Sequence, residues 1–282
     1  MKRGLVLEGG AMRGLFTAGV LDVMMEEAVE YDGAIGVSAG AAFGCNIKSR
    51  QPGRVLRYNL RFCRDPRYCS FRSWVKTGDL FGAKFCYQTL PDVLDPFDVQ
   101  AFVENPMDFY VVGTDVTTGK PVYHNCMKGD HSDLEWMRAS ASMPLASRVV
   151  EVDGYQLLDG GISDSIPLKF FQSIGYDRCV VVLTQPLGYV KTTDKALPVM
   201  RAMLRRYPKL VEDMAHRPEA YNACLDWIRE QERQGRIFVI RPEKALDIGR
   251  VEHDPQKIQA VYQHGRATAE KRLQALKEFL AV

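Results

Sequence analysis

Short apolar runs alternate with longer amphipathic stretches along this chain, and the alternation predicts its fold class. The short runs have the length of strands, and the longer stretches repeat their apolar residues with the period of a helix. We expect strands at residues 5–7, 34–37, 108–113, 121–124, 148–152, 155–158, 178–184 and 236–240, and helices at residues 15–29, 134–141, 197–206, 219–234 and 255–280. Strands interleaved with helices favour an α/β protein with a mainly parallel central sheet.

Two pairs of predicted strands depart from the parallel pattern. Residues 108–113 and 121–124 flank a polar turn, and residues 148–152 and 155–158 flank Asp153-Gly154, a dipeptide typical of tight β-hairpins. We interpret Asp115, which lies in the first turn, as a turn-forming residue rather than a catalytic acid. A hairpin excursion beside the parallel sheet is therefore expected.

Composition and patterning indicate one globular unit. The chain has 282 residues, of which 46% are hydrophobic, and a formal net charge of +2. This near-neutral balance gives no reason to expect a nucleic-acid partner. Because no linker or repeat interrupts the chain, we expect a core of residues 1–185 with a mostly helical C-terminal extension, residues 186–282, packed on it.

The cysteines and the N-terminal residues bear on the cellular compartment. The seven cysteines form no C-x-x-C pair and no zinc-like Cys/His spacing, which favours buried free thiols in a reducing compartment. The apolar run after Met1-Lys2-Arg3 stops at Glu8, which is too short for a signal peptide, and no stretch has transmembrane length. We expect a cytoplasmic protein and leave peripheral contact with the inner membrane open.

A basic segment with interleaved aromatic residues extends from Arg50 to Lys84. One interpretation is a cap over the functional site that meets an anionic lipid surface. The other interpretation, which we favour for most of these residues, is a solvated helix face whose aromatic side chains lie in the core.

The candidate nucleophile lies in Gly36-Val37-Ser38-Ala39-Gly40, a G-x-S-x-G pattern. The pattern follows a predicted strand and precedes the small-residue run Ala41-Ala42-Phe43-Gly44. A sharp strand-to-helix turn with glycine on both sides would expose the Ser38 hydroxyl near a helix N-terminus. The alternative is a glycine-rich turn in which Ser38 only caps the helix.

A second glycine-rich turn, Gly9-Gly10-Ala11-Met12-Arg13-Gly14, follows the first predicted strand. Such a turn can point free backbone N–H groups into a concavity that holds an oxyanion or a phosphate. The dinucleotide pattern G-x-G-x-x-G needs a glycine at position 11, and the Lys-Ser/Thr pair of a P-loop is absent. Because neighbouring parallel strands end at the same edge of a sheet, we expect an oxyanion hole beside Ser38. A plain tight turn is the alternative.

The candidate base is the carboxylate of Asp159-Gly160-Gly161, which ends another predicted strand. Taken alone, Asp159 could be a turn residue. Paired with Ser38, it could accept the serine proton. An α/β-hydrolase would use a later histidine instead, but His216, His253 and His264 lack the strand-end setting that this role requires, so we interpret them as surface or core residues.

In order and separation, these three motifs resemble those of patatin-like phospholipases. Further matches are Gly113-Thr114-Asp115, Thr118-Gly119-Lys120, the Ala139–Pro144 segment and Pro167. The resemblance spans roughly residues 4 to 185, and the C-terminal third resembles the extension of a bacterial subgroup. It implies a three-layer α/β/α fold and a lipid acyl hydrolase with a Ser-Asp dyad and no metal or cofactor.

Carried over by motif, the resemblance makes Ser38 the nucleophile, Asp159 the proton acceptor and the N–H groups around Gly9, Gly10 and Ala11 the oxyanion hole. It makes Arg13 a residue that braces the glycine-rich turn. Ala11 stands where the family usually has a third glycine, and a positive φ there would cost alanine about 1 kcal/mol.

The sequence therefore predicts hydrolysis of acyl esters, with a lipid as the expected substrate. Two alternatives stay open. One is a carboxylesterase or thioesterase that uses the same dyad on non-lipid substrates. The other is a catalytically weak module that binds lipid or acyl ligands without turnover.

Overall fold

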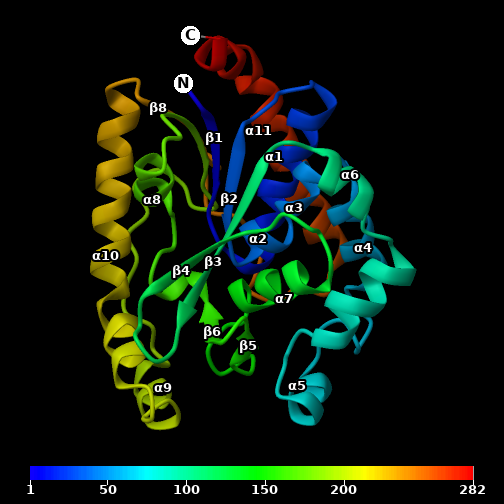
Figure 1. Cartoon of the computed structure of the whole chain (residues 1–282), viewed down its shortest axis with the longest axis vertical. Helices are drawn as coiled ribbons and strands as arrows, with labels where there is room; N and C mark the ends of the chain where they lie inside the picture. Colours follow the sequence, from blue (N-terminus) through cyan, green and yellow to red (C-terminus); the bar gives the residue numbers. More distant parts are fainter. Residues whose placement is uncertain (282) are drawn as a thin grey trace.

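The computed structural model describes residues 1–281 and contains an eight-stranded sheet with helices on both faces (Figure 1). The strands are β1 (Arg3–Leu7), β2 (Gly33–Val37), β3 (Asp108–Asp115), β4 (Pro121–Asn125), β5 (Val150–Val152), β6 (Tyr155–Asp159), β7 (Arg178–Val182) and β8 (Ile237–Ile240). Their order is β5-β6-β3-β2-β1-β7-β8, and β4 pairs with β3. The run from β3 to β8 is parallel, whereas β4, β5 and β6 pair antiparallel. The mainly parallel sheet with a hairpin excursion is confirmed.

The helices in chain order are α1 (Gly14–Glu26), α2 (Ala39–Ala42), α3 (Cys45–Lys48), α4 (Arg54–Phe62), α5 (Phe71–Thr77), α6 (Val99–Glu104), α7 (His131–Ser140), α8 (Leu168–Ser173), α9 (Leu197–Met203), α10 (Pro208–Arg233) and α11 (Pro255–Ala281). Short 3₁₀ turns η1 (Ala11–Arg13) and η3 (Gly160–Ile162) and a π-helical segment η2 (Phe85–Leu94) complete them. The helix expected at residues 219–234 instead begins at Pro208 and continues through Pro218. The described helices include none that is long and apolar enough to cross a membrane.

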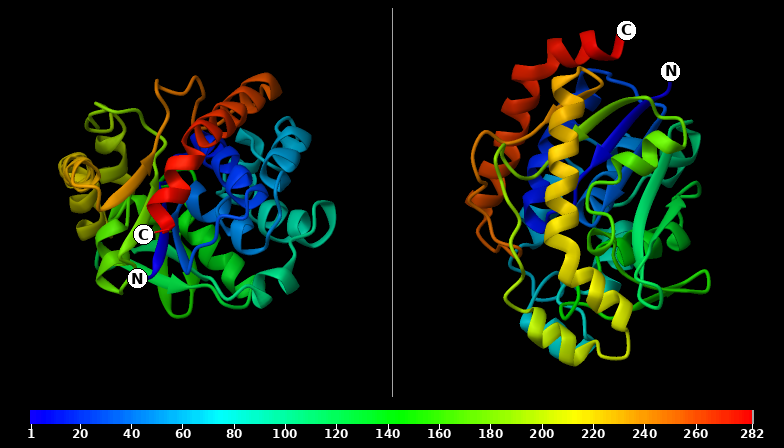
Figure 2. Two further views of the ribbon diagram at one scale, coloured as in Figure 1. Left: turned by 90° about the horizontal axis from the view of Figure 1, so that it is seen from above. Right: turned by 90° about the vertical axis from the view of Figure 1, so that its left-hand side faces the viewer.

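Successive side chains of a strand point to opposite sides of the sheet, and in the parallel strands both sides are buried. In β1, Leu5 and Leu7 pack into the core on one face, and Val6 packs into the core on the other. Helices α1, α4, α7 and α11 cover the first face, and α8 and α10 cover the second. Figure 2 shows α10, in yellow, and α11, in orange and red, on opposite sides of the sheet. This is the three-layer α/β/α arrangement.

The C-terminal part of the chain contributes to both the sheet and the helical layers. Strand β8 adds a parallel edge beside β7, and α11 packs along α1. The two helices cross with their backbones in contact, since a Cβ atom on Gly19 would lie 2.1 Å from the Tyr262 carbonyl oxygen and one on Gly265 would lie 2.0 Å from the Phe16 carbonyl oxygen. Only glycine permits an approach this close.

The basic aromatic segment, residues 50–84, mostly follows the interpretation that we favoured. Tyr58 and Phe62 are buried in the core. Two residues depart from it. Arg54 is buried and lies 3.5 Å from a carboxylate oxygen of Asp95, whereas Phe71, at the start of α5, is 71% exposed.

Candidate active site

The strand register brings Ser38 and Asp159 together, although 121 positions separate them in the sequence. Strand β3 runs past the end of β2: Val37 pairs with Val112 of β3, and the next β3 residue, Gly113, pairs with Asp159 of β6. Ser38 follows Val37 directly, so both side chains lie at one edge of the sheet. The Ser38 hydroxyl lies close enough to the Asp159 carboxylate to affect its pKa.

Ser38 occupies a sharp turn between β2 and α2. Its backbone has φ +55° and ψ −120°, a conformation that few non-glycine residues adopt. A Cβ atom on Gly36 would lie 2.3 Å from the Gly40 carbonyl oxygen, so the turn can close only around glycine. The Ser38 side chain makes no capping hydrogen bond to α2. The expected strand-to-helix turn is therefore present, and the interpretation of Ser38 as a helix cap is wrong.

Asp159 is buried, and its surroundings hold the carboxylate in one orientation. Its Oδ1 accepts a hydrogen bond from the Gly161 N–H at 2.8 Å, and its backbone N–H donates to the Ser142 carbonyl oxygen at 2.8 Å. Burial raises the pKa of Asp159, although the nearby Ser38 hydroxyl, the charges of Arg217 and Lys191 and the Gly161 N–H act in the opposite direction. A carboxylate with a raised pKa is a better proton acceptor near neutral pH.

The glycine-rich turn lies against Ser38, as expected from the parallel strands. A Cβ atom on Gly9 would lie 3.0 Å from the Cβ of Ser38. Within residues 1–281, the backbone N–H groups of Gly10 and Ala11 donate no hydrogen bond. Ala11 has φ +49°, which is the left-handed conformation that alanine disfavours. The turn thus presents free N–H groups next to the serine.

The role of Arg13 as a residue that braces this turn stays a prediction. The Nε atom of Arg13 is buried and has no hydrogen-bond partner among the described residues. The side chain lines a polar cavity.

Two cavities of different character meet at Ser38. Ser38, Ala11 and Met143 line both of them. The apolar cavity, of about 120 Å³, extends beneath α4, η2 and α7, and its lining includes Phe43, Tyr58, Phe81, Leu90, Leu134 and Met137. The polar cavity, of about 430 Å³, extends toward the residues after β7 and toward α10.

Several residues of this site carry no sequence signal of their own. The Ser140 Oγ accepts a hydrogen bond from the Ser38 N–H at 2.9 Å and so holds the turn at the end of α7. Glu8 is buried and accepts hydrogen bonds from the Thr184 N–H at 2.6 Å and from the Tyr221 hydroxyl. Of these, only Ser140 lies in a segment that the motif comparison had picked out, Ala139–Pro144.

The interpretation of Asp115 as a turn residue is confirmed by its hydrogen bonds. Its carboxylate accepts hydrogen bonds from the Thr117 N–H and the Thr118 hydroxyl, both at 2.9 Å. The three later histidines, His216, His253 and His264, line neither cavity.

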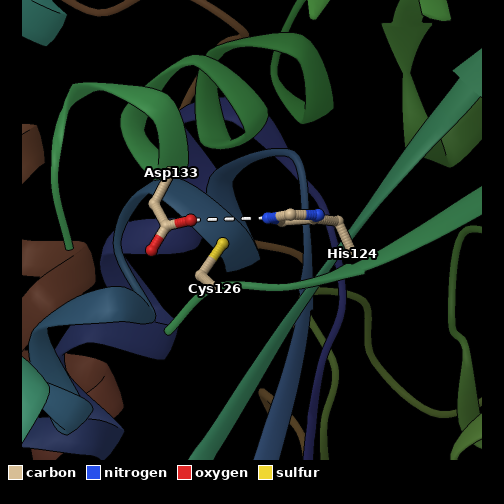
Figure 3. Close-up of side chains that lie close together, drawn as sticks. All are labelled: His124, Cys126 and Asp133. Atoms are coloured by element: carbon tan, nitrogen blue, oxygen red, sulfur yellow. Dashed lines mark hydrogen bonds and ion pairs between the residues drawn. The ribbon is translucent and has the colours of Figure 1, made fainter. Parts of the chain in front are cut away.

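A separate cluster of His124, Cys126 and Asp133 lies at the entry to α7 (Figure 3). The three side chains approach within 4.8 Å of one another. Asp133 accepts hydrogen bonds from the Lys128 and Gly129 N–H groups at 2.7 and 2.8 Å and faces the His124 Nε2 at 3.4 Å. Burial raises the pKa of the Cys126 thiol. Through the Asp133 carboxylate, the cluster closes the loop before α7.

This chain is similar to known proteins over most of its length. Residues 5–171 match the patatin-like phospholipase family, and residues 207–281 match a domain of unknown function, DUF6363. The uncharacterized protein YjjU of Escherichia coli (strain K12) is 31% identical over 252 residues, which cover 86% of this chain and 69% of that protein. Lysophospholipase NTE1 of Chaetomium globosum is 27% identical over 180 residues, which cover 62% of this chain and 11% of that protein. The crystal structure of VipD from Legionella pneumophila aligns with a TM-score of 0.48 and 12% identity over 97% of this chain and 67% of that one.

The family match covers more than half of the chain, and the matched region contains Ser38, Asp159 and the glycine-rich turn. The three motifs that suggested the resemblance thus lie within the part of the chain that the family describes, and the strand register brings them to one edge of the sheet. This chain belongs to the patatin-like phospholipase family and is a lipid acyl hydrolase.

Proposed function

We propose that Ser38 and Asp159 form the catalytic dyad of this hydrolase and that the N–H groups of Gly9, Gly10 and Ala11 form its oxyanion hole. The Ser38 oxygen attacks the ester carbonyl carbon of a lipid while Asp159 takes the serine proton. The tetrahedral oxyanion is stabilised by the free N–H groups of the glycine-rich turn.

Collapse of this intermediate breaks the ester bond, and the leaving alcohol takes the proton from Asp159. An acyl group then remains on Ser38. Water attacks the acyl-enzyme, and Asp159 accepts the proton of that water. As the second intermediate collapses, the proton returns to the Ser38 oxygen and the fatty acid leaves.

The observation that carries this proposal is the strand register across β3. Val37, just before Ser38, and Asp159 pair with consecutive residues of β3, at the same edge of the sheet. The turn conformation of Ser38, without a capping hydrogen bond, also supports it. The apolar cavity that opens at Ser38 suits an acyl chain and favours a lipid over a small polar ester.

Fluorophosphonate labelling, mapped by mass spectrometry, tests the dyad. We expect the wild type to be labelled on Ser38, Ser38→Ala to lose the label and Asp159→Asn to react far more slowly. A wild type that stays unlabelled both with and without lipid vesicles would refute the activated serine and favour the binding module.

A series of 4-nitrophenyl esters tests the acyl cavity. We expect kcat/KM to rise with the length of the acyl chain, because each buried methylene contributes about 0.8 kcal/mol. A preference for acetate over longer chains would favour the non-lipid esterase instead.

A further inference from the structure

The polar cavity beside Ser38 carries an excess of positive charge. Its lining includes five cationic side chains, Arg13, Lys191, Lys195, Arg217 and Arg250, and three carboxylates, Glu8, Asp159 and Asp194. Two positive charges are therefore left over in a concave, partly enclosed space. Such a cavity concentrates anions.

Two arginines of this cavity each have a buried Nε atom without a hydrogen-bond partner among residues 1–281. Arg250 forms an ion pair with Asp194 at 3.1 Å. In contrast, the Nε atoms of Arg13 and Arg217 are both buried and make no hydrogen bond within residues 1–281. Leaving a charged donor buried and unpaired is costly, so these two groups are poised to bind an anion that enters the cavity.

Lys191 is the third cation of this group, and α10 fixes its position. The Asn222 side chain pairs with the backbone of Lys191 through two hydrogen bonds of 2.8 and 2.9 Å, and the Lys191 Nζ lies 4.5 Å from the centre of the Tyr221 ring. Burial, with the charges of Arg217, Arg13 and Arg250, lowers the pKa of Lys191 to about 8, although Glu8 acts in the opposite direction. A bound anion would relieve this repulsion.

The anion subsite lies beside the reacting groups. A Cβ atom on Gly161 would lie 3.0 Å both from an Nη atom of Arg217 and from the Oδ1 of Asp159. Arg13 belongs to the same turn as the proposed oxyanion donors. A lipid whose ester is at Ser38 and whose acyl chain fills the apolar cavity would therefore extend its head group into the polar one.

We propose that Arg13, Lys191 and Arg217 form a subsite for the phosphate of a lipid head group, and that the enzyme prefers anionic phospholipids without a fixed positive charge. This inference rests on the proposed attack by Ser38, which places the ester between the two cavities. Two of the three residues come from the C-terminal extension, so the extension determines head-group selectivity.

The same cavity disfavours a choline head group. A quaternary ammonium group would add a cation to a site that already has an excess of them. Its usual partner is an exposed aromatic face, and the Lys191 ammonium already covers Tyr221.

Protection of Lys191 from acetylation tests the subsite without requiring turnover. In Ser38→Ala protein, the rate of Lys191 acetylation is measured by mass spectrometry against that of exposed Lys128, in phosphate-free buffer. We expect micelles of dioctanoyl phosphatidate in neutral detergent to slow Lys191 acetylation about tenfold. Dioctanoylglycerol micelles should have no effect.

Three outcomes of this experiment would overturn the proposal. The absence of protection by phosphatidate would remove the subsite. Equal protection by inorganic phosphate at the same concentration would mean that a free anion, not a head group, binds there. Equal protection by dioctanoyl phosphatidylcholine would refute the preference against a fixed cation.

Steady-state kinetics give a second, independent readout. The quantity compared is the ratio of kcat/KM for dioctanoyl phosphatidate to that for dioctanoylglycerol. We expect Arg217→Gln and Lys191→Met each to lower this ratio about tenfold, and Arg233→Gln, a matched loss of charge at the far end of α10, to leave it unchanged. An unchanged ratio in the first two variants would contradict the subsite.

Failure of the proposed catalytic dyad would look different. In that case, Ser38→Ala would keep full hydrolytic activity, while the protection of Lys191 would still report on the subsite.

Discussion

Replacing Asp159 with asparagine should remove most of the activity and, at the same time, make the protein more stable. Asparagine has nearly the same shape, and its Oδ1 can still accept the hydrogen bond from the Gly161 N–H. It cannot accept the proton of Ser38. The substitution therefore removes the proposed base without disturbing the turn that holds it.

The magnitude follows from what remains in the site. Positioned acid–base catalysis contributes about 10²- to 10⁴-fold to a rate, which corresponds to about 2.7–5.4 kcal/mol of transition-state stabilisation. The glycine-rich turn and the apolar cavity are unchanged in the variant. We therefore expect kcat to decrease by about 10²- to 10⁴-fold and KM to change little.

The stability effect has the opposite sign. Burial raises the pKa of Asp159 in the folded protein, so the folded state binds the proton more tightly than the unfolded state. The free energy of unfolding of the wild type therefore falls as pH rises from the unfolded pKa through the folded pKa, and the penalty persists above it. Asparagine has no charge to bury, so the Tm advantage of the variant should be absent at pH 3 and greatest at neutral pH.

The assay combines 4-nitrophenyl ester hydrolysis with thermal unfolding at several pH values. Asp164→Asn is the matched control, because burial also raises the pKa of Asp164, its carboxylate accepts a hydrogen bond from the Tyr123 hydroxyl, and it lines neither cavity. The control should gain stability at neutral pH and keep its activity. Wild-type turnover by Asp159→Asn, or a Tm below that of the wild type at neutral pH, would refute the reasoning.

Four further predictions concern the turns, the surface and the extension. In urea titrations, Gly40→Ala should lower the free energy of unfolding by about 3 kcal/mol, because a Cβ atom there would lie 2.4 Å from a carbonyl oxygen of β1. The control Gly154→Ala, whose Cβ would meet no atom within 4 Å, should lower the free energy of unfolding by about 1 kcal/mol. Ala11→Gly should change the free energy of unfolding by less than about 1 kcal/mol, because relief of the left-handed strain is offset by the larger entropy that glycine loses on folding. The variant should still be labelled by the fluorophosphonate. If residues 50–84 meet a lipid surface through α5, association with anionic vesicles, measured by sedimentation, should weaken both as salt rises and in Phe71→Ser. Binding that depends on neither would exclude α5 as a membrane contact. A chain that ends at residue 185 should show no cooperative thermal transition, because it lacks β8 and α11.

The sequence was most informative where a motif is local. The Ser38 turn, the glycine-rich turn and the Asp159 turn each lie within a few residues at the end of an apolar run, so strand ends and glycine spacing were enough to identify them. Their meeting at one sheet edge followed from the parallel topology. The register across β3 then supplied the detail that no single motif contains.

Other features depended on contacts that sequence patterns do not encode. Arg217 and Lys191 reach the site from a part of the chain whose pattern indicated only basic helices, and their neighbours come from the opposite end of the sequence. Helices α2, α3, α5 and α6 are too short to show a clear apolar period. Proline is disfavoured inside a helix, yet α10 continues through Pro218, with Tyr221 and Leu225 packed against the sheet.

The glycine crossing of α1 and α11 has a consequence for how the protein is made. Helix α1 is buried almost all round, from Gly14 to Met24, and much of its cover comes from α11. On the ribosome, α1 is made long before its partner, which begins at Pro255. Until α11 is made, the nascent chain therefore carries an incompletely covered apolar helix, which is the kind of segment that chaperones bind and that aggregates when translation stalls.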